Sequence, residues 1–136
     1  MEKLPERDDF CFVCGKNNPK GLHLHFKREG EKVISVFILD KHYQGYNNII
    51  HGGIISLILD EAMAHLQTKE ERFLTGKITV KFFSSLKAGE KTRVTAWIEN
   101  NRKKVKETVA QLSKEDGTII AEAQALMFVV KEGEER

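Results

Sequence analysis

The chain has 136 residues, of which 40% are hydrophobic and 31% charged, so it is long enough for one domain with a buried core. Its formal net charge of +2 excludes the clustered basic excess of an obvious nucleic-acid or membrane-surface protein. No apolar run approaches the roughly 20 residues that cross a bilayer, and the first residues do not resemble a signal peptide. We therefore expect a cytoplasmic protein without nucleic-acid or membrane partners, in which the cysteines stay reduced.

The N-terminal extension, residues 1–20, contains the pattern Cys11-x-x-Cys14, which has the spacing of half a zinc site. His23 and His25 lie downstream on the same face of a predicted strand, so a metal site with two cysteines and two histidines is one interpretation. Zinc-finger histidines are usually spaced more widely on a helix, and the sequence has no second CxxC. We favour an ordered segment that leads into the first strand.

Two strands and then one long helix are predicted next. Residues 22–26 alternate between apolar and polar side chains, and residues 33–39 are mostly β-branched or aromatic and carry no charge. From Gly53 to about Gln67 the apolar positions recur at three- and four-residue spacing, which predicts a helix. This helix is apolar over most of its circumference, so we expect other elements to enclose it.

Four more strands are predicted, at about residues 75–84, 92–99, 104–113 and 118–130, with turns at Asn100-Asn101 and Glu115-Asp116-Gly117. In the last strand small residues occupy successive positions of one face, which suits a sheet lying close against a helix. The order of elements predicts an α+β domain, in which a curved, mostly antiparallel sheet wraps one central helix. The domain is expected to span residues 21–131, followed by a charged tail at residues 132–136.

The start of the helix carries the first candidate catalytic group. Gly52 and Gly53 let a ligand approach the backbone closely, and the first N–H groups of a helix have no intrahelical partner. With the helix dipole, these amides could polarise a carbonyl and stabilise an oxyanion. The alternative is that the glycines only permit a sharp turn into the helix.

Asp60 is the second candidate, because a carboxylate among apolar helix residues is costly to bury unless it is paired or used. Glu61 points about 100° away, and we interpret it as the solvated edge of the helix. Asp60 lies about 10 Å along the axis from Gly53, so one helix cannot readily supply both groups to one carbonyl. Two antiparallel copies can, which predicts a homodimer with two interfacial sites.

The segment His51-Gly52-Gly53, with Asp60 nine positions after the histidine on the only long helix, resembles the hot-dog-fold thioesterase superfamily. Within it, the resemblance is to the phenylacetate-degradation and hydroxybenzoyl-CoA thioesterase branch, over nearly the whole chain. It implies hydrolysis of an acyl-CoA, with Asp60 as general base or nucleophile and the helix amides as the oxyanion hole. Coenzyme A would be part of the substrate, with no other cofactor and no metal, and the dimer could pair into a tetramer.

The same resemblance assigns supporting roles. His51 would flank the thioester, although a histidine that caps the helix is an equal alternative. Thr75 would hold the attacking water, and Gln44 would serve as a polar helper, at a position that departs from the usual spacing in relatives. Basic side chains in the turn between the predicted strands at residues 92–99 and 104–113 would neutralise the CoA phosphates, unless this is an ordinary solvated turn. These hairpin residues are Asn101, Arg102 and Lys103.

Two other functions stay open. One is an acyl-CoA-binding module that has the same fold but does not turn over its ligand. Asp60 argues against it, because binding alone gains little from a buried carboxylate beside a thioester. The other is a hot-dog enoyl-CoA hydratase, since such enzymes also pair a histidine with a carboxylate.

Overall fold

The computed structural model describes residues 5–131, so the predicted tail at residues 132–136 lies outside the described residues. One α-helix, one short 3-10 helix and six strands make up the regular structure of this part of the chain. They are β1 (Lys27–Glu29), β2 (Lys32–Ile38), η1 (Lys41–Tyr43), α1 (Gly52–Ala64), β3 (Glu71–Phe82), β4 (Lys91–Asn101), β5 (Val105–Lys114) and β6 (Ile119–Lys131). No helix within residues 5–131 has the length and apolar character that crossing a membrane requires.

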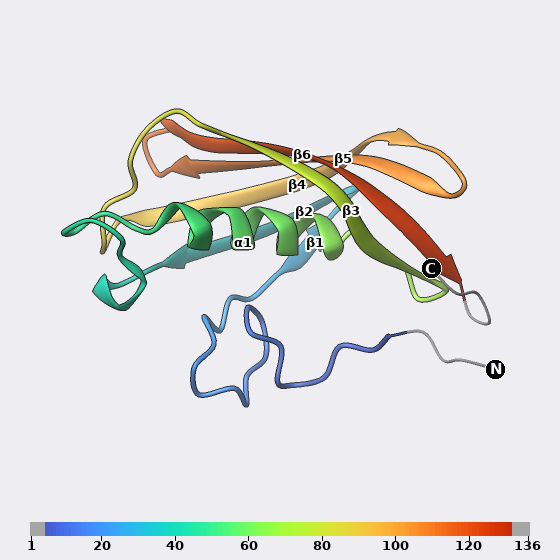
Figure 1. The fold of residues 1–136 in the computed structure, drawn as a ribbon, viewed down its shortest axis with the longest axis horizontal. Coiled ribbons are helices and arrows are strands. Elements are labelled where there is room, and N and C mark those ends of the chain that lie inside the picture. Colours follow the sequence, from blue (N-terminus) through green and yellow to red (C-terminus); the bar gives the residue numbers. More distant parts are fainter. Residues whose placement is uncertain (1–4, 132–136) are drawn as a thin grey trace.

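The six strands form one sheet in the order β1-β2-β4-β5-β6-β3, and every neighbouring pair is antiparallel. The sheet curves over helix α1, which lies along its inner face (Figure 1). The predicted hot-dog architecture, an α+β domain with one central helix, is therefore confirmed. The order also makes β3 an edge strand, although β3 follows the helix directly in the sequence.

Helix α1 packs closely on the sheet because the facing positions are small. Its buried residues are Ile55, Ile58, Leu59, Ala62 and Met63, which recur at helical spacing. Buried alanines lie on the inner face of the three central strands and leave room for the helix backbone. They are Ala96, Ala110, Ala121, Ala123 and Ala125. Each large apolar side chain of α1 that is fully buried against the sheet stabilises the fold by about 1.5–3 kcal/mol.

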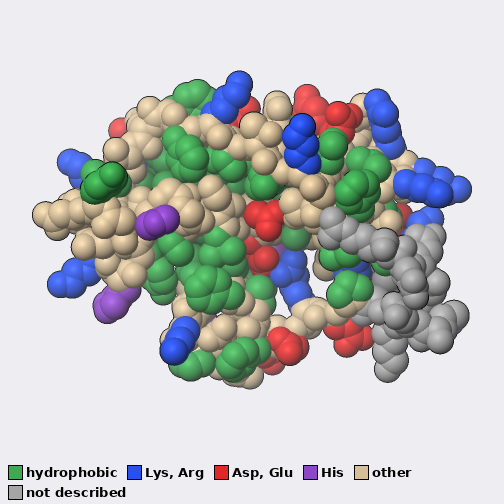
Figure 2. All heavy atoms as spheres, in the orientation of Figure 1, with side chains coloured by type: hydrophobic (Ala, Val, Ile, Leu, Met, Phe, Trp, Pro, Cys, Tyr) green, Lys and Arg blue, Asp and Glu red, His purple; other side chains and the backbone are tan. Residues whose placement is uncertain are grey.

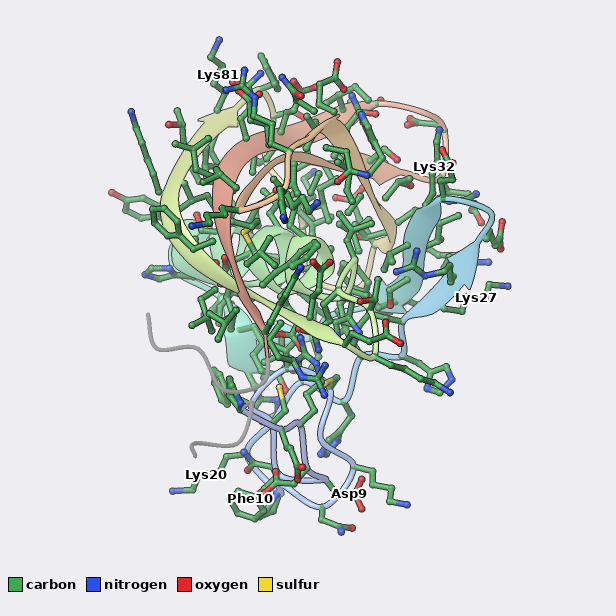
Figure 3. The ribbon with its side chains drawn as sticks, turned by 90° about the vertical axis from the view of Figure 1, so that its right-hand side faces the viewer. Asp9, Phe10, Lys20, Lys27, Lys32 and Lys81 are labelled. Atoms are coloured by element: carbon green, nitrogen blue, oxygen red, sulfur yellow. The ribbon has the colours of Figure 1, made fainter. Side chains whose placement is uncertain are left out.

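Residues 5–26, called the N-terminal strap below, contain no helix or strand. The strap lies on the side of α1 away from the sheet and forms a small lobe, on which Asp9, Phe10 and Lys20 are labelled (Figure 3). It folds back on itself, since the Leu24 amide donates to the Val13 carbonyl at 2.9 Å. Both side chains are buried in the main core, so the strap is anchored by apolar packing.

Three predicted boundaries are wrong. The predicted strand at residues 22–26 belongs to the strap, because His23 has a φ of +56° and Leu24 bonds to the strap rather than to the sheet. The helix ends at Ala64, where Arg28 donates to the following carbonyls of residues 65–67. The strand after the helix begins at residue 71 rather than 75.

Candidate active site

His51 caps the start of helix α1. Its Nδ1 accepts a hydrogen bond from the Gly53 N–H at 2.8 Å, so the capping role considered for this histidine is present. Since Nδ1 accepts, the neutral ring carries its proton on Nε2, which can donate to a ligand. The Gly53 amide is thus occupied, whereas Gly52, the first helical residue, has an N–H without an intrahelical acceptor.

An apolar groove of about 690 Å³ opens beside this helix start, lined by His51 and Gly52 among others. Three aromatic side chains at the groove are largely exposed: Tyr46 (85%), Phe82 (53%) and Phe83 (61%). Clustered exposed aromatic surface usually marks a ligand site or an interface. The groove can therefore receive an apolar group, a second protein surface, or both.

Asp60 lies two turns further along the helix and is held by Thr75 from strand β3. The Thr75 Oγ1 donates to Asp60 Oδ1 at 2.6 Å, and both residues are partly buried. A carboxylate has two oxygens, so this bond leaves room for a further donor such as water. The structure thus brings together the two residues for which the sequence suggested a carboxylate and a water-holding hydroxyl.

A bulge in β3 directs Thr75 towards the helix. The pairing with β6 shifts register between Thr75 and Lys77, so Gly76 is the inserted residue. A Cβ atom at Gly76 would lie 2.0 Å from the Phe128 ring, so a larger residue here would require the Phe128 side chain, which is 41% exposed, to move. The Thr75-Gly76 pair is therefore the local sequence feature that places the hydroxyl.

Two half-sites result. The amide half-site comprises His51, Gly52 and the groove, and the carboxylate half-site comprises Asp60 and Thr75. Gly53 and Asp60 are separated by about 10 Å along the helix axis, at 1.5 Å per residue. Within one chain the two half-sites therefore do not converge on a single carbonyl.

Gln44 lies beside the amide half-site but is engaged in its own loop. Its Oε1 accepts from the Asn48 N–H at 3.1 Å, and its backbone pairs with Ile50, next to His51. Gly45 separates it from the histidine, and a Cβ atom there would come within 3.3 Å of the His51 ring. The side chain of Gln44 thus orders the loop that leads into α1.

The hairpin residues Asn101, Arg102 and Lys103 lie at the end of the sheet away from the amide half-site. Asn101 pairs with Lys106, Lys106 with Met127, and Met127 with Thr75, so these four residues form one row across the sheet. Three strand spacings separate Asn101 from Thr75, about 14 Å. Arg102 and Lys103 follow in the exposed turn, and Asn101 accepts a hydrogen bond from Lys106. The hairpin therefore belongs to the end of the molecule that holds the carboxylate half-site.

The cysteines contact the helix rather than the two histidines considered with them. Cys11 Sγ lies 3.4 Å from Glu61 Oε2, and Cys14 belongs to the same cluster. His23 and His25 are exposed, and the ligand atoms gathered around the cysteines in the described chain come from Glu61 instead.

Glu61 is not the solvated edge that helix periodicity predicts, because its side chain is only 12% exposed. Arg7 Nη1 contacts its Oε2 at 2.5 Å and His65 Nε2 does so at 3.1 Å. Burial opposes the charged form, but the hydrogen bond from His65 and the charge of Arg7 outweigh it and lower the pKa of Glu61 to about 2. Burial, with the hydrogen bond to Glu61, raises the pKa of the Cys14 thiol to about 12. The i,i+4 spacing of Glu61 and His65 is the signal that sequence reasoning missed.

Comparisons with known proteins bear on these half-sites. Residues 47–121 match the family model of the thioesterase superfamily, a stretch that includes His51, Asp60 and Thr75. No curated protein matches the sequence. Among known structures of similar fold, a Streptococcus mutans protein bound to acetyl CoA is 17% identical, with a TM-score of 0.74 over 82% of this chain and 91% of that chain.

Two further structures are similar over most of their length. The E. coli PaaI protein from the phenylacetic acid degradation operon is 13% identical, with a TM-score of 0.76 over 82% of each chain. A Haemophilus influenzae thioesterase is 12% identical, with a TM-score of 0.79 over 90% of this chain and 89% of that chain. At such identities the likeness establishes the fold.

Proposed function

The chain belongs to the thioesterase superfamily, and we propose that it hydrolyses acyl-CoA thioesters at sites shared between two copies of the chain. The observation that carries this proposal is the Asp60 carboxylate, held by the Thr75 hydroxyl at 2.6 Å on the same helix whose first amide borders a groove. The similar fold of a protein bound to acetyl CoA supports a CoA ester as the substrate class.

In the proposed reaction, the thioester carbonyl oxygen accepts a hydrogen bond from the Gly52 N–H at the positive end of the α1 dipole. The partner's Asp60 takes a proton from water as the water oxygen attacks the carbonyl carbon. The resulting tetrahedral oxyanion is stabilised by the same amide. It collapses with cleavage of the C–S bond, and the departing sulfur of CoA takes up the proton, which leaves a carboxylic acid and a free thiol.

The shared site follows from the separation of the half-sites along one helix. A two-fold related copy with an antiparallel helix would bring its Asp60 to the Gly52 amide of the first chain. The exposed aromatic residues Tyr46, Phe82 and Phe83 are apolar surface that such a copy would cover. Strand β3 is a 12-residue sheet edge, and unpaired edges of this length favour pairing with another chain.

Supporting residues take their roles from this arrangement. The His51 Nε2–H would donate to the thioester while Nδ1 keeps the helix cap. Arg102 and Lys103 lie at the carboxylate end of each chain, so in the dimer they would border the shared site and neutralise CoA phosphates. Gln44 would order the loop that forms one wall of the groove.

The test is a panel of aromatic, short-chain and long-chain acyl-CoA esters, assayed by release of the CoA thiol. We expect release from at least one class at a rate well above the uncatalysed reaction. Tight binding of every ester without thiol release would replace this proposal with an acyl-CoA-binding module. Loss of enoyl absorbance from an enoyl-CoA without thiol release would replace it with a hydratase.

The shared site is tested by mixing two inactive variants. Gly52→Pro removes the proposed amide donor at the first helical position, where proline is tolerated, and Asp60→Asn removes the base. Each homodimer should be inactive, whereas randomly mixed dimers should recover roughly a quarter of the wild-type rate, because half are mixed and each holds one intact site. Failure to recover activity, with mixed dimers verified, would contradict a shared site.

A further inference from the structure

A second group of chemically reactive side chains lies where the N-terminal strap meets helix α1. The Sγ atoms of Cys11 and Cys14 and a carboxylate oxygen of Glu61 all lie within 4.8 Å of one another. Sulfur atoms are visible where the strap lobe meets the body of the domain (Figure 3). We propose that Cys11, Cys14 and Glu61 bind one zinc ion, which fastens the strap to the helix.

The spacing of these atoms fits a tetrahedral zinc site. Zinc–sulfur bonds of about 2.3 Å and zinc–oxygen bonds of about 2.0–2.2 Å place neighbouring sulfur and oxygen ligands roughly 3.5 Å apart. The observed distance between Cys11 Sγ and Glu61 Oε2 is 3.4 Å. Cys11 and Glu61 are therefore already at coordination spacing, and the Cys14 sulfur lies within 4.8 Å of the other two ligand atoms.

The turn that carries the two cysteines is built into the fold. The Gly15 N–H donates to the Cys11 carbonyl at 2.9 Å, and a Cβ atom at Gly15 would lie 2.3 Å from the Cys11 nitrogen. Only glycine fits this turn. Val13, between the cysteines, is 2% exposed and fixes the turn in the core. Both thiols are thereby presented to the helix while remaining partly accessible.

The donor set favours zinc over hard cations. Two thiolates with one carboxylate suit a thiophilic ion, whereas magnesium and calcium prefer oxygen ligands alone. His65 supports the carboxylate, since its Nε2 lies 3.1 Å from Glu61 Oε2 and its ring stacks on Phe26 at 4.3 Å. Such a hydrogen bond to a metal-binding carboxylate is a usual outer contact of metal sites. Water would fill the fourth position.

Arg7 occupies the place of a cation in this cluster. Its Nη1 lies 2.5 Å from Glu61 Oε2, 3.8 Å from Cys11 Sγ and 3.7 Å from Cys14 Sγ. The guanidinium and a zinc ion would repel each other at these distances, so zinc binding displaces Arg7. The Arg7 side chain is 29% exposed, so it can turn into solvent. The cluster is thus a pocket selective for positive charge, in which zinc replaces the arginine and releases the thiol protons.

The first test measures metal in the full chain without an affinity tag. After equilibration with zinc and removal of excess metal, we expect one zinc ion per chain. Replacement by cobalt should give the charge-transfer absorption of thiolate bound to cobalt. A chain that retains no zinc, or a cobalt spectrum without the sulfur band, would overturn the proposal. So would a Cys11–Cys14 disulfide in zinc-free protein purified under reducing conditions.

Variants separate the zinc site from a simple ion pair. Glu61→Gln should lower zinc affinity by at least about tenfold, whereas the neighbouring Asp60→Asn and the exposed His25→Ala should leave it unchanged. Arg7→Ala should keep or increase zinc affinity, because it removes a competing cation. Loss of zinc binding in Arg7→Ala, or full binding in Glu61→Gln, would overturn the assignment. These outcomes do not depend on the proposed thioesterase reaction and are decisive even if cysteine variants do not fold.

Discussion

Asp60 and Glu61 are neighbours in the sequence, yet helix α1 turns them to different surroundings. Asp60 faces the edge strand β3 and receives a hydrogen bond from one neutral hydroxyl, that of Thr75. Glu61 faces the N-terminal strap and is surrounded by Arg7, His65 and a thiol. Acidic side chains are visible among hydrophobic ones at the centre of the face over α1 (Figure 2).

The difference shows how the surroundings of a carboxylate decide what it can do. Positive and hydrogen-bonding neighbours outweigh the burial of Glu61 and lower its pKa to about 2. A general base works best when its pKa lies near the working pH, so Glu61 is poorly suited to accept a proton from water. Its neighbours fix it as an ion that holds the strap. Asp60, by contrast, has a hydrogen bond from a neutral hydroxyl, which suits the role of base proposed for it.

The strongest test of whether Asp60 and Glu61 have separate roles is to remove each charge in turn. Asp60→Asn should lower kcat/KM for an acyl-CoA ester by about 10²- to 10⁴-fold, because the water loses its base. Glu61→Gln makes the same chemical change one residue later and should keep kcat within about tenfold. Steady-state thiol release measures both variants. An equal loss in the two would mean that the carboxylates do not have separate roles.

Thr75 tests whether the hydroxyl positions Asp60. Thr75→Val keeps the shape of the side chain but removes the donor, and should lower kcat by about 10- to 100-fold, the value of a hydrogen bond to a charged group. KM should change little, since the substrate does not lose a contact. Thr75→Ser restores the hydroxyl and should recover most of the rate. A serine variant as slow as the valine variant would argue against positioning.

Stability should show the reverse ranking of the two carboxylates. In metal-free protein, Glu61→Gln should lower the free energy of unfolding by about 1–3 kcal/mol, because Arg7 and His65 lose a buried charged partner. Asp60→Asn should have a smaller effect, since the amide oxygen of asparagine can still accept the hydrogen bond from the Thr75 hydroxyl. Urea unfolding monitored by circular dichroism measures both free energies. The values are compared with the same dependence on urea concentration (m value) for every variant. A larger loss in Asp60→Asn would reverse the comparison.

The smallest effect is expected at the hairpin. Arg102→Ala and Lys103→Ala should each raise KM by roughly twofold to fivefold, as exposed charge contacts are weak. The effect should fade at high salt because the Debye length shortens. Lys20→Ala changes an equally exposed charge on the strap lobe and serves as the control (Figure 3). A KM effect of the same size in the control would show a general influence of net charge.

Sequence patterns predict the sheet and the helix because these depend on local periodicity, whereas the pairing of Asp60 with Thr75 is expected from the family resemblance. Asp60 is unusual in an apolar helix, and Thr75 follows it at a spacing that the fold brings into contact. The surroundings of Glu61 could not be predicted in this way. Periodicity gives the direction of a side chain but not what covers it, and Arg7 is 54 residues distant in the chain.

The strand predicted at residues 22–26 failed for a related reason. Alternating apolar residues indicate that every second side chain is buried, whichever backbone supplies the hydrogen bonds. Here the partner is the strap itself, and Leu24 reaches the core from an irregular segment. By contrast, the His51 cap is a local interaction over two residues, which is why it could be weighed from the sequence.

Gly76 is the extra residue of the bulge in strand β3, and it changes which side chains face inward on either side of it. Residues on one face of a strand normally differ by even numbers, yet Thr75 meets the helix and Ile78, three positions later, packs on the core. The inserted residue absorbs the odd step. Without it, turning the hydroxyl inward would turn the apolar half of the strand outward. One residue without a side chain thus lets a single strand hold the Asp60 carboxylate at one end and fill the core at the other.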